Sequence, residues 1–213
     1  MMNYAKKIIL NIGTVQNILQ KREIRNWTDK GKPLPPPHAV KQKTIKMFAE
    51  NFSIDVLVET GTYQGAMVNA MKNTFKRIYS IELQPDLCKQ AKARFSGYDH
   101  ISIIQGDSSE VLSDVLSVID QPILFWLDGH YSHGITARGI LDTPIHQELQ
   151  HIRDHQENGH IILIDDARLF IGQDDYPTLD ELQKLVTEYF PRHTFDVADD
   201  IIRIYIPDRV LNS

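Results

Sequence analysis

Short apolar stretches alternate with longer segments of mixed polarity along most of the chain. The apolar stretches are rich in branched residues and occur at 54–58, 77–82, 101–105, 122–127 and 160–164. The segments between them, near 65–75, 85–95, 108–118 and 144–157, are long enough for helices. Because strands joined by helices run parallel and are covered on both faces, this pattern predicts an α/β fold with a doubly wound, Rossmann-like sheet.

The pattern changes near the C-terminus. After a predicted helix near 178–190, apolar stretches at 193–198 and 201–206 are separated only by Asp199 and Asp200. A two-residue connection is typical of a β-hairpin. We therefore expect an antiparallel pair of strands to close an otherwise parallel sheet.

The first fifty residues differ from the rest in charge and in proline content. The stretch 31–37, Gly-Lys-Pro-Leu-Pro-Pro-Pro, excludes a helix or a central strand. It divides a basic arm with its linker (1–37) from a main domain (38–213), which begins with a predicted helix at 38–52. Residues 1–50 carry a formal charge of +7 and the remainder −12. The arm either meets an anionic partner or packs as a helical extension on the acidic body, which itself argues against nucleic-acid binding.

Composition is that of a soluble globular protein. The 213 residues are 42% hydrophobic and 24% charged. No apolar run approaches the roughly 20 residues of a membrane helix, and the N-terminus does not resemble a secretion signal. Cys88 is the only cysteine, which excludes an intramolecular disulfide and a cysteine-rich zinc site. We expect a cytoplasmic protein without membrane contact, and a homodimer stays open.

The residues that follow the first predicted strand suggest a cofactor-binding loop. Gly61 allows a tight turn that approaches a ligand closely, and Gly65 opens the next helix, whose N-terminus offers free N–H donors. The loop has neither the lysine of a P-loop nor the second glycine of a dinucleotide motif. A purely structural turn accounts for the loop equally well.

Polar residues also follow the second and third predicted strands. Glu82 can accept hydrogen bonds from two ribose hydroxyls, or it can favour the start of the next helix. Asp107 or Ser108 can bond an adenine edge, and the same Ser-Ser-Glu segment is a good helix opening.

Three carboxylates follow the fourth and fifth predicted strands. Adjacent parallel strands would bring Asp128 beside Asp165 and Asp166 at one edge of the sheet. Crowded carboxylates repel each other unless a cation or protons offset them, and oxygen ligands suit Mg²⁺, with Mn²⁺ or Ca²⁺ also open. Helix capping or surface placement is the alternative. His130, two residues past Asp128, is a candidate general base.

Five segments in order carry a family resemblance: ETGTYQG at 59–65, SIELQPD at 80–86, IQGDSSE at 104–110, FWLDGHYS at 125–132 and ILIDDAR at 162–168. Together they resemble class I S-adenosylmethionine-dependent methyltransferases over about residues 53–206. The resemblance implies a seven-stranded sheet with a reversed last strand. The acids after the fourth and fifth strands resemble those of metal-assisted O-methyltransferases of the catechol and macrocin types.

The resemblance also implies a role for each candidate residue. Glu59, Gly61, Thr62 and Gly65 would surround the methionine part of the cofactor, Glu82 would hold the ribose, Asp107 and Ser108 would face the adenine, and Asp128, Asp165 and Asp166 would bind the metal. Asp128 would also border the cofactor and take part in catalysis with His130. The sequence departs from the family pattern at Tyr63, where a second glycine often stands, and at Asp165-Asp166, which is Asp-Asn in catechol-type enzymes.

These observations predict S-adenosylmethionine-dependent O-methylation of a small hydroxylated substrate, assisted by a divalent cation, with a sugar or sugar-bearing metabolite as the first candidate. Residues 133–143 would form either a substrate lid or an ordinary surface loop. Two alternatives are a non-catalytic module that binds S-adenosylmethionine and an NAD-dependent oxidoreductase, since Glu82 suits NAD ribose equally well. A nucleic-acid methyltransferase is less favoured, because no Asn/Asp-Pro-Pro-Tyr-type segment follows the fourth strand.

Overall fold

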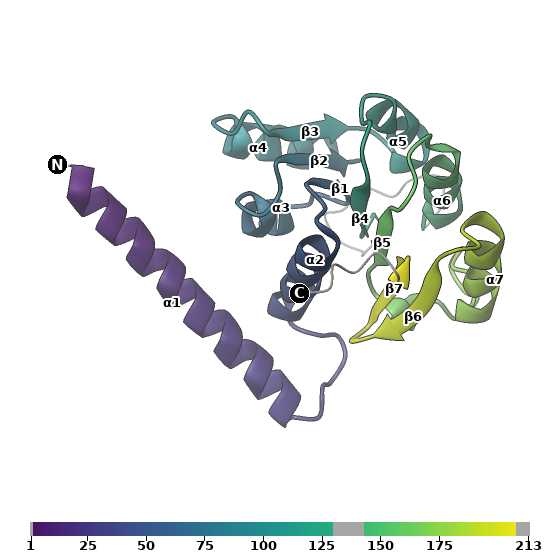
Figure 1. The fold of residues 1–213 in the computed structure, drawn as a ribbon, viewed down its shortest axis with the longest axis horizontal. Helices are drawn as coiled ribbons and strands as arrows, with labels where there is room; N and C mark the ends of the chain where they lie inside the picture. Colours follow the sequence, from purple (N-terminus) through teal and green to yellow (C-terminus); the bar gives the residue numbers. More distant parts are fainter. Residues whose placement is uncertain (1, 130–142, 208–213) are drawn as a thin grey trace.

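A seven-stranded sheet forms the centre of the protein (Figure 1). The computed structural model describes residues 2–129 and 143–207; for residues 2–14 and for Gln16 it describes the backbone alone. The strands are β1 (Val56–Thr60), β2 (Arg77–Glu82), β3 (Ile101–Gln105), β4 (Ile123–Leu127), β5 (Ile161–Ile164), β6 (Thr194–Ala198) and β7 (Ile201–Tyr205). Their order across the sheet is β3-β2-β1-β4-β5-β7-β6.

The reversed last strand is confirmed. Strands β1 to β5 pair in parallel, whereas β7 is antiparallel to both β5 and β6. The β6–β7 hairpin turns at Asp199 and Asp200, whose φ angles are 54° and 63°. Positive φ at both central residues is what a two-residue hairpin turn requires, and aspartate tolerates it better than most residues.

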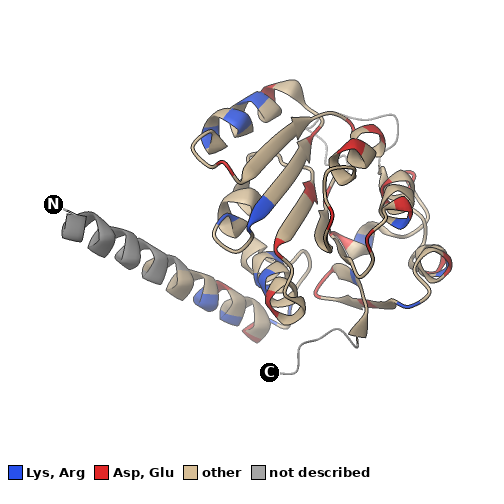
Figure 2. Cartoon of the chain, turned by 45° about the horizontal axis from the view of Figure 1, so that its top comes forward, with Lys and Arg blue, Asp and Glu red and all other residues tan. Residues whose placement is uncertain are grey.

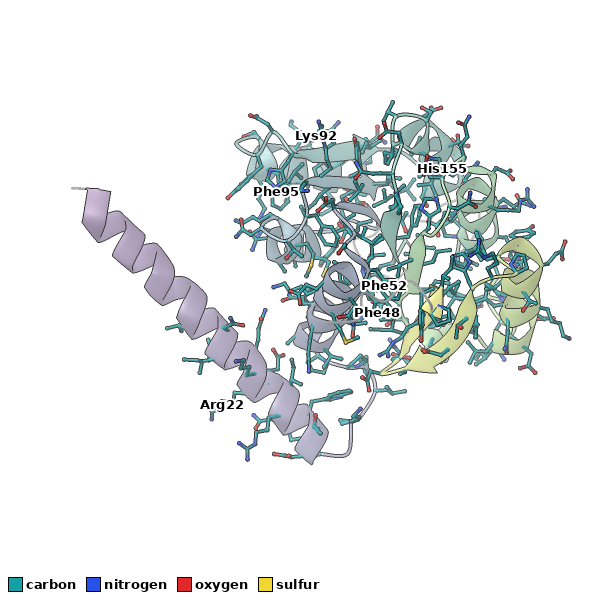
Figure 3. All side chains as sticks on the ribbon, in the orientation of Figure 1. Arg22, Phe48, Phe52, Lys92, Phe95 and His155 are labelled. Carbon is teal, nitrogen blue, oxygen red and sulfur yellow. The ribbon has the colours of Figure 1, made fainter. Side chains whose placement is uncertain are left out.

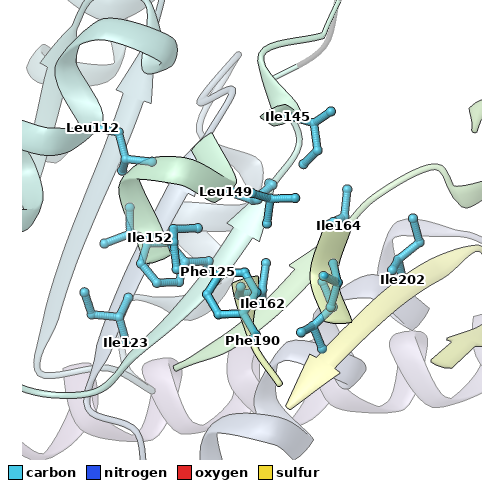
Figure 4. Packing of buried hydrophobic residues seen from close by; sticks show 14 of the residues in the cluster. Leu112, Ile123, Phe125, Ile145, Leu149, Ile152, Ile162, Ile164, Phe190 and Ile202 are labelled. Atoms are coloured by element: carbon cyan, nitrogen blue, oxygen red, sulfur yellow. The ribbon is translucent and has the colours of Figure 1, made fainter. Parts of the chain in front are cut away.

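Helices cover both faces of the sheet, which confirms the doubly wound architecture. On one face α2 (His38–Phe52), α3 (Ala66–Met71) and α4 (Pro85–Phe95) contribute to one core, and on the other α5 (Ser108–Leu116), α6 (Ile145–Asp154) and α7 (Leu179–Tyr189) contribute to a second. Along β4, Ile123 and Phe125 point into the second core (Figure 4), whereas Trp126 points into the first. This two-sided burial explains why the predicted strands are continuously apolar.

The first strand begins two residues later than predicted. The apolar stretch 54–58 includes Ile54, but that residue belongs to the end of α2: its N–H bonds to the Ala49 carbonyl, and Ser53 before it is left-handed with φ 52°. Apolar character alone does not separate a buried helix end from a strand. As a result, Glu59 lies inside β1 and not after it.

Helix α1 (Met2–Asp29) extends away from the domain, and its end is held by a buried tryptophan (Figure 1). The Trp27 indole N–H donates to the Pro33 carbonyl at 2.8 Å. Basic residues occur along the described part of α1 and on α2 (Figure 2). The division into an arm and a domain at residue 37 stays a prediction. Within the described residues, no helix is both long enough and apolar enough to cross a membrane.

Helix α2 is fixed against the sheet by aromatic packing. Phe48 and Phe52 stack with their ring centroids 5.8 Å apart (Figure 3), and both meet the Tyr205 ring of β7 edge-on, at 5.2 and 5.8 Å. Because β7 runs opposite to β5, this contact fixes the C-terminal half of α2 near the start of β5. The first turns of α2 then lie at the carboxyl end of β5, where the candidate site is.

Candidate active site

The loop after β1 contains a glycine at a position with no room for a side chain. Gly61 has φ +85°, and a Cβ atom there would lie 2.3 Å from the Asp128 carbonyl oxygen. The N–H groups of Gly61 and Thr62 both donate to the Ile81 carbonyl, at 2.9 and 3.2 Å. The loop therefore lies directly against the end of β4 and is tied to β2 on its other side.

Tyr63 occupies the position of the missing second glycine with the backbone conformation that a glycine would adopt. Its φ is 48°, in the left-handed region. Its N–H donates to the Glu82 carboxylate at 2.6 Å, and its side chain is 43% exposed. Tyr63 therefore adopts the left-handed conformation at this position although it is not a glycine.

Glu59 is a buried carboxyl group whose proton affinity is strongly altered. Its side chain accepts a short hydrogen bond from Ser80, which in turn is 2.6 Å from the Thr62 hydroxyl. The pKa of Glu59 is raised to about 8: burial is the main cause, the hydrogen bond from Ser80 opposes it, and the charges of Asp128 and Glu82 add to the rise. Near neutral pH Glu59 therefore carries a proton, and a positive group beside it would favour its release.

Glu82 links the two loops at the ends of β1 and β2. Its carboxylate accepts from the Tyr63 N–H and, at 2.9 Å, from the Gln84 N–H, and only 6% of the residue is exposed. Its place at the end of β2 is the one that the sequence predicted. Its proposed role toward a ribose stays a prediction.

The residues after β3 have partners inside the protein. Asp107 caps α5 by accepting from the Ser109 N–H at 2.9 Å and from the Ser109 hydroxyl at 2.7 Å. The buried Ser108 hydroxyl donates to Glu148 at 2.7 Å. The helix-opening alternative therefore describes the geometry of this segment, and contact with an adenine stays a prediction for both residues.

The backbone places the three predicted acidic residues at one edge of the sheet, at the ends of β4 and β5. The Asp128 N–H donates to the Thr60 carbonyl at 3.1 Å, and the Asp165 N–H donates to the Leu127 carbonyl at 3.0 Å. Asp166 follows directly, with φ 55°. We call Asp128, Asp165 and Asp166 the carboxylate cluster.

A lysine that the sequence analysis missed lies against the carboxylate cluster. Lys41 Nζ forms a short ion pair with Asp165 Oδ2 and lies 3.3 Å from Asp166 Oδ1. Burial lowers the pKa of Lys41, but Asp165, Asp166 and Asp128 raise it by more, so the net shift is upward. Lys41 stands on the same helical stripe as the core residues Ile45 and Phe48, and a lysine on a buried stripe is the signal that could have revealed it.

A second basic residue, Arg168, also pairs with Asp166. Arg168 donates to Asp166 at 2.7 Å and makes a short ion pair with Asp200, whose other oxygen accepts from the Arg168 N–H at 2.9 Å. Arg168 lies in the segment ILIDDAR, whereas the sequence around Asp200 indicates only a turn.

The arrangement does not fit a divalent metal as it stands. Two of the three predicted ligands, Asp165 and Asp166, already contact Lys41. In the part of the chain that the structure describes, no three histidine, cysteine or acidic side chains are grouped to hold a metal ion. The Mg²⁺ prediction is therefore not confirmed.

A narrow pocket opens beside this edge, between the ends of β4 and β5 and the start of α6, and its lining includes Gly129, Glu148, Asp165 and Tyr176. Glu148 is 2% exposed and was not among the predicted site residues. His130 and nearly all of the predicted lid at 133–143 lie outside the described residues. Their roles stay predictions.

No protein-family model and no curated protein matches the sequence. Solved structures do match in fold. The SAH-bound methyltransferase PaMTH1 of Podospora anserina is 18% identical with a TM-score of 0.58, covering 93% of this chain and 96% of its own. The O-methyltransferase TomG of Streptomyces achromogenes, in complex with SAM, is 12% identical with a TM-score of 0.59, covering 88% of each chain.

An O-methyltransferase of Bacillus cereus in complex with SAH is 11% identical with a TM-score of 0.55, covering 87% of this chain and 90% of its own. At these identities the comparisons establish the fold: the protein has the architecture of class I S-adenosylmethionine-dependent methyltransferases, as the sequence resemblance implied.

Replacing Gly61 by alanine should distort the loop after β1. The new Cβ would meet the backbone of Asp128, which cannot move aside as a flexible side chain could, and the residue would keep a strained positive φ. We expect a loss of about 1–3 kcal/mol in the free energy of unfolding, measured by urea denaturation. Gly97→Ala is the matched control, since a Cβ there meets nothing within 4 Å. Equal stability of the two variants would contradict this account.

The raised pKa of Glu59 should appear in the pH dependence of stability. Between its ordinary value of 4.5 and about 8, the folded state holds a proton that the unfolded state has lost. Stability relative to Glu59→Gln should therefore fall by about 1.4 kcal/mol per pH unit across this window as pH rises, and level off above it. Urea denaturation of both proteins from pH 5 to pH 9 measures the difference, with the exposed Glu50→Gln as control. Parallel profiles for wild type and Glu59→Gln would show that the carboxyl group is ionised.

Proposed function

We propose that the protein is an S-adenosylmethionine-dependent methyltransferase that methylates a hydroxyl group of a small molecule. The observation that supports this most directly is the buried Glu59 beside the Gly61 turn, in a fold shared with methyltransferases that bind SAM or SAH.

The residues present fit a positively charged nucleoside. Glu59 has a hydroxyl partner, Ser80, but no cationic partner among the described residues, so a cationic ligand at the β1 loop would favour its ionised form. Gly61 has no side chain, and its backbone lies directly against the Asp128 carbonyl. Glu82 is held at the end of β2 with both oxygens oriented by backbone N–H groups, and each oxygen keeps a further lone pair for a hydroxyl.

The bound cofactor would supply a sulfonium with an electrophilic methyl group. In the transfer, a bond forms between the acceptor oxygen and the methyl carbon, the bond from that carbon to sulfur breaks, and its electron pair stays on sulfur as the thioether forms. The hydroxyl proton leaves to a base, for which His130 is the proposed group. The protein's main task is to hold the oxygen in line with the methyl group.

The identity of the acceptor is a further part of this proposal. A sugar or sugar-bearing metabolite is the first candidate acceptor. The narrow pocket beside Asp165 and Glu148 has a volume of about 10 Å³, which holds about one water molecule, so it is not itself the acceptor site. Metal assistance is a separate part of this proposal. At the carboxylate cluster, the described residues place a positive charge beside Asp165, and that charge belongs to Lys41. A cytoplasmic location is likewise only proposed.

Calorimetric titration with S-adenosylhomocysteine tests the cofactor assignment. We expect one molecule to bind per chain, with net proton release near neutral pH, because the α-ammonium group that S-adenosylhomocysteine keeps would lower the pKa of Glu59 from about 8. The affinity should rise with pH until about pH 8, and Glu59→Gln should abolish the proton release. Glu50→Gln should behave as wild type.

The same titration separates the alternatives. Binding of NADH but not of S-adenosylhomocysteine would favour the oxidoreductase and contradict the proposal. Binding of S-adenosylhomocysteine without methyl transfer from S-adenosylmethionine to any of a broad panel of hydroxylated acceptors would favour a non-catalytic module.

A further inference from the structure

Lys41 combines a surface type of residue with a buried position. It lies in the first turns of α2, on the stripe that continues through Ile45 and Phe48 into the core, and its side chain is only 15% exposed. Burying a lysine is costly unless the charge is paired, so its direction is not a matter of chance packing.

Several independent contacts fix the position of the Lys41 ammonium group. The aromatic contacts of Phe48 and Phe52 with Tyr205 fix α2 along the sheet, and the parallel pairing of β4 with β5 fixes the carboxylate cluster. Lys41 Nζ then contacts Asp165, whose side chain is 1% exposed, and Asp166, whose side chain is 11% exposed. Lys41 and Arg168, which pairs with Asp166, together supply two positive charges to these two carboxylates.

One donor of the ammonium group remains. A lysine carries three N–H donors, and those directed to Asp165 and Asp166 account for two. The third has no hydrogen-bond partner among the described residues, and 15% of the side chain is exposed. A charged donor stabilises the negative charge that develops on an oxygen atom as it loses its proton. A metal ion stabilises the same charge.

We propose that the Lys41 ammonium group takes the place of a divalent metal in this protein: with Arg168 it offsets the charge of Asp165 and Asp166, and it orients the acceptor oxygen for methyl transfer. This inference deepens the proposed function and rests on it for the identity of the reaction. The statement about the cation itself can be tested without any activity.

The first test is a titration of the full-length protein with Mn²⁺, followed by electron paramagnetic resonance of the free ion. Wild type should leave Mn²⁺ free. Lys41→Met removes the internal cation and leaves the carboxylate cluster unneutralised, so that variant should bind one Mn²⁺. Lys41→Arg keeps the charge and should bind none. Lys43→Met, which removes an exposed lysine two residues further along α2, is the matched control and should behave as wild type.

Two results would overturn the inference: one Mn²⁺ bound by wild type and lost in Asp165→Asn, or no Mn²⁺ bound by a folded Lys41→Met. If Lys41→Met does not fold, wild type and Lys41→Arg decide the question, because binding of Mn²⁺ by either protein contradicts an internal cation.

The second test is methyl transfer once an acceptor has been found. Wild-type transfer should be unaffected by EDTA. Lys41→Met should lower kcat by about 10²-fold with the KM for S-adenosylmethionine unchanged, and Lys41→Arg should recover part of the loss. Loss of wild-type activity in EDTA that Mg²⁺ restores would overturn the role of Lys41. Failure of wild type to bind S-adenosylhomocysteine would instead overturn the proposed function and leave the Mn²⁺ result standing.

Discussion

Carboxylates that are brought together at the end of a parallel sheet need a positive charge, and here the chain supplies one itself. The end of β5 places Asp165 and Asp166 in an almost dry environment, where ionised groups without a partner would destabilise the folded state. Lys41 reaches them from α2, a helix held in position by its aromatic contacts with β7. The β7 strand, the first helix of the domain and the acidic edge are therefore mutually dependent: moving any one of them would leave a buried charge without its partner.

The buried Glu59 differs from Asp165 and Asp166 in its partners. Glu59 has only the Ser80 hydroxyl as a hydrogen-bond partner in the described residues, and its pKa is raised to about 8. Asp165 and Asp166 are neutralised from within, whereas Glu59 is left in a protonated form that a cationic ligand would convert. Asp165 and Asp166 thus have cationic partners without a ligand, whereas Glu59 would gain one from a cationic ligand. This difference follows from which residue faces each carboxyl group.

The turns after β1 and β4 couple the two edges. Gly61 lies so close to the Asp128 carbonyl that a change on either loop must move the other. Asp128 also acts electrostatically on both Glu59 and Lys41, raising both pKa values. A ligand that favours ionisation of Glu59 would therefore be felt by the carboxylate cluster through Asp128.

Local pattern was enough to determine the elements of this protein and the edge where polar groups collect. Apolar stretches at strand spacing, the Asp199-Asp200 turn and the ordered segments after each strand predicted the reversed sheet and brought Asp128, Asp165 and Asp166 together, because strand direction and alternation are local properties. The partner of each polar group was decided only by the tertiary structure. Lys41 is 124 residues from Asp165 in sequence, so no spacing rule could connect them, and the sequence analysis assigned the missing positive charge to a metal. Glu148 and Asp200 were missed for the same reason: packing of distant segments, and not the pattern within any one of them, places their side chains beside Ser108 and Arg168.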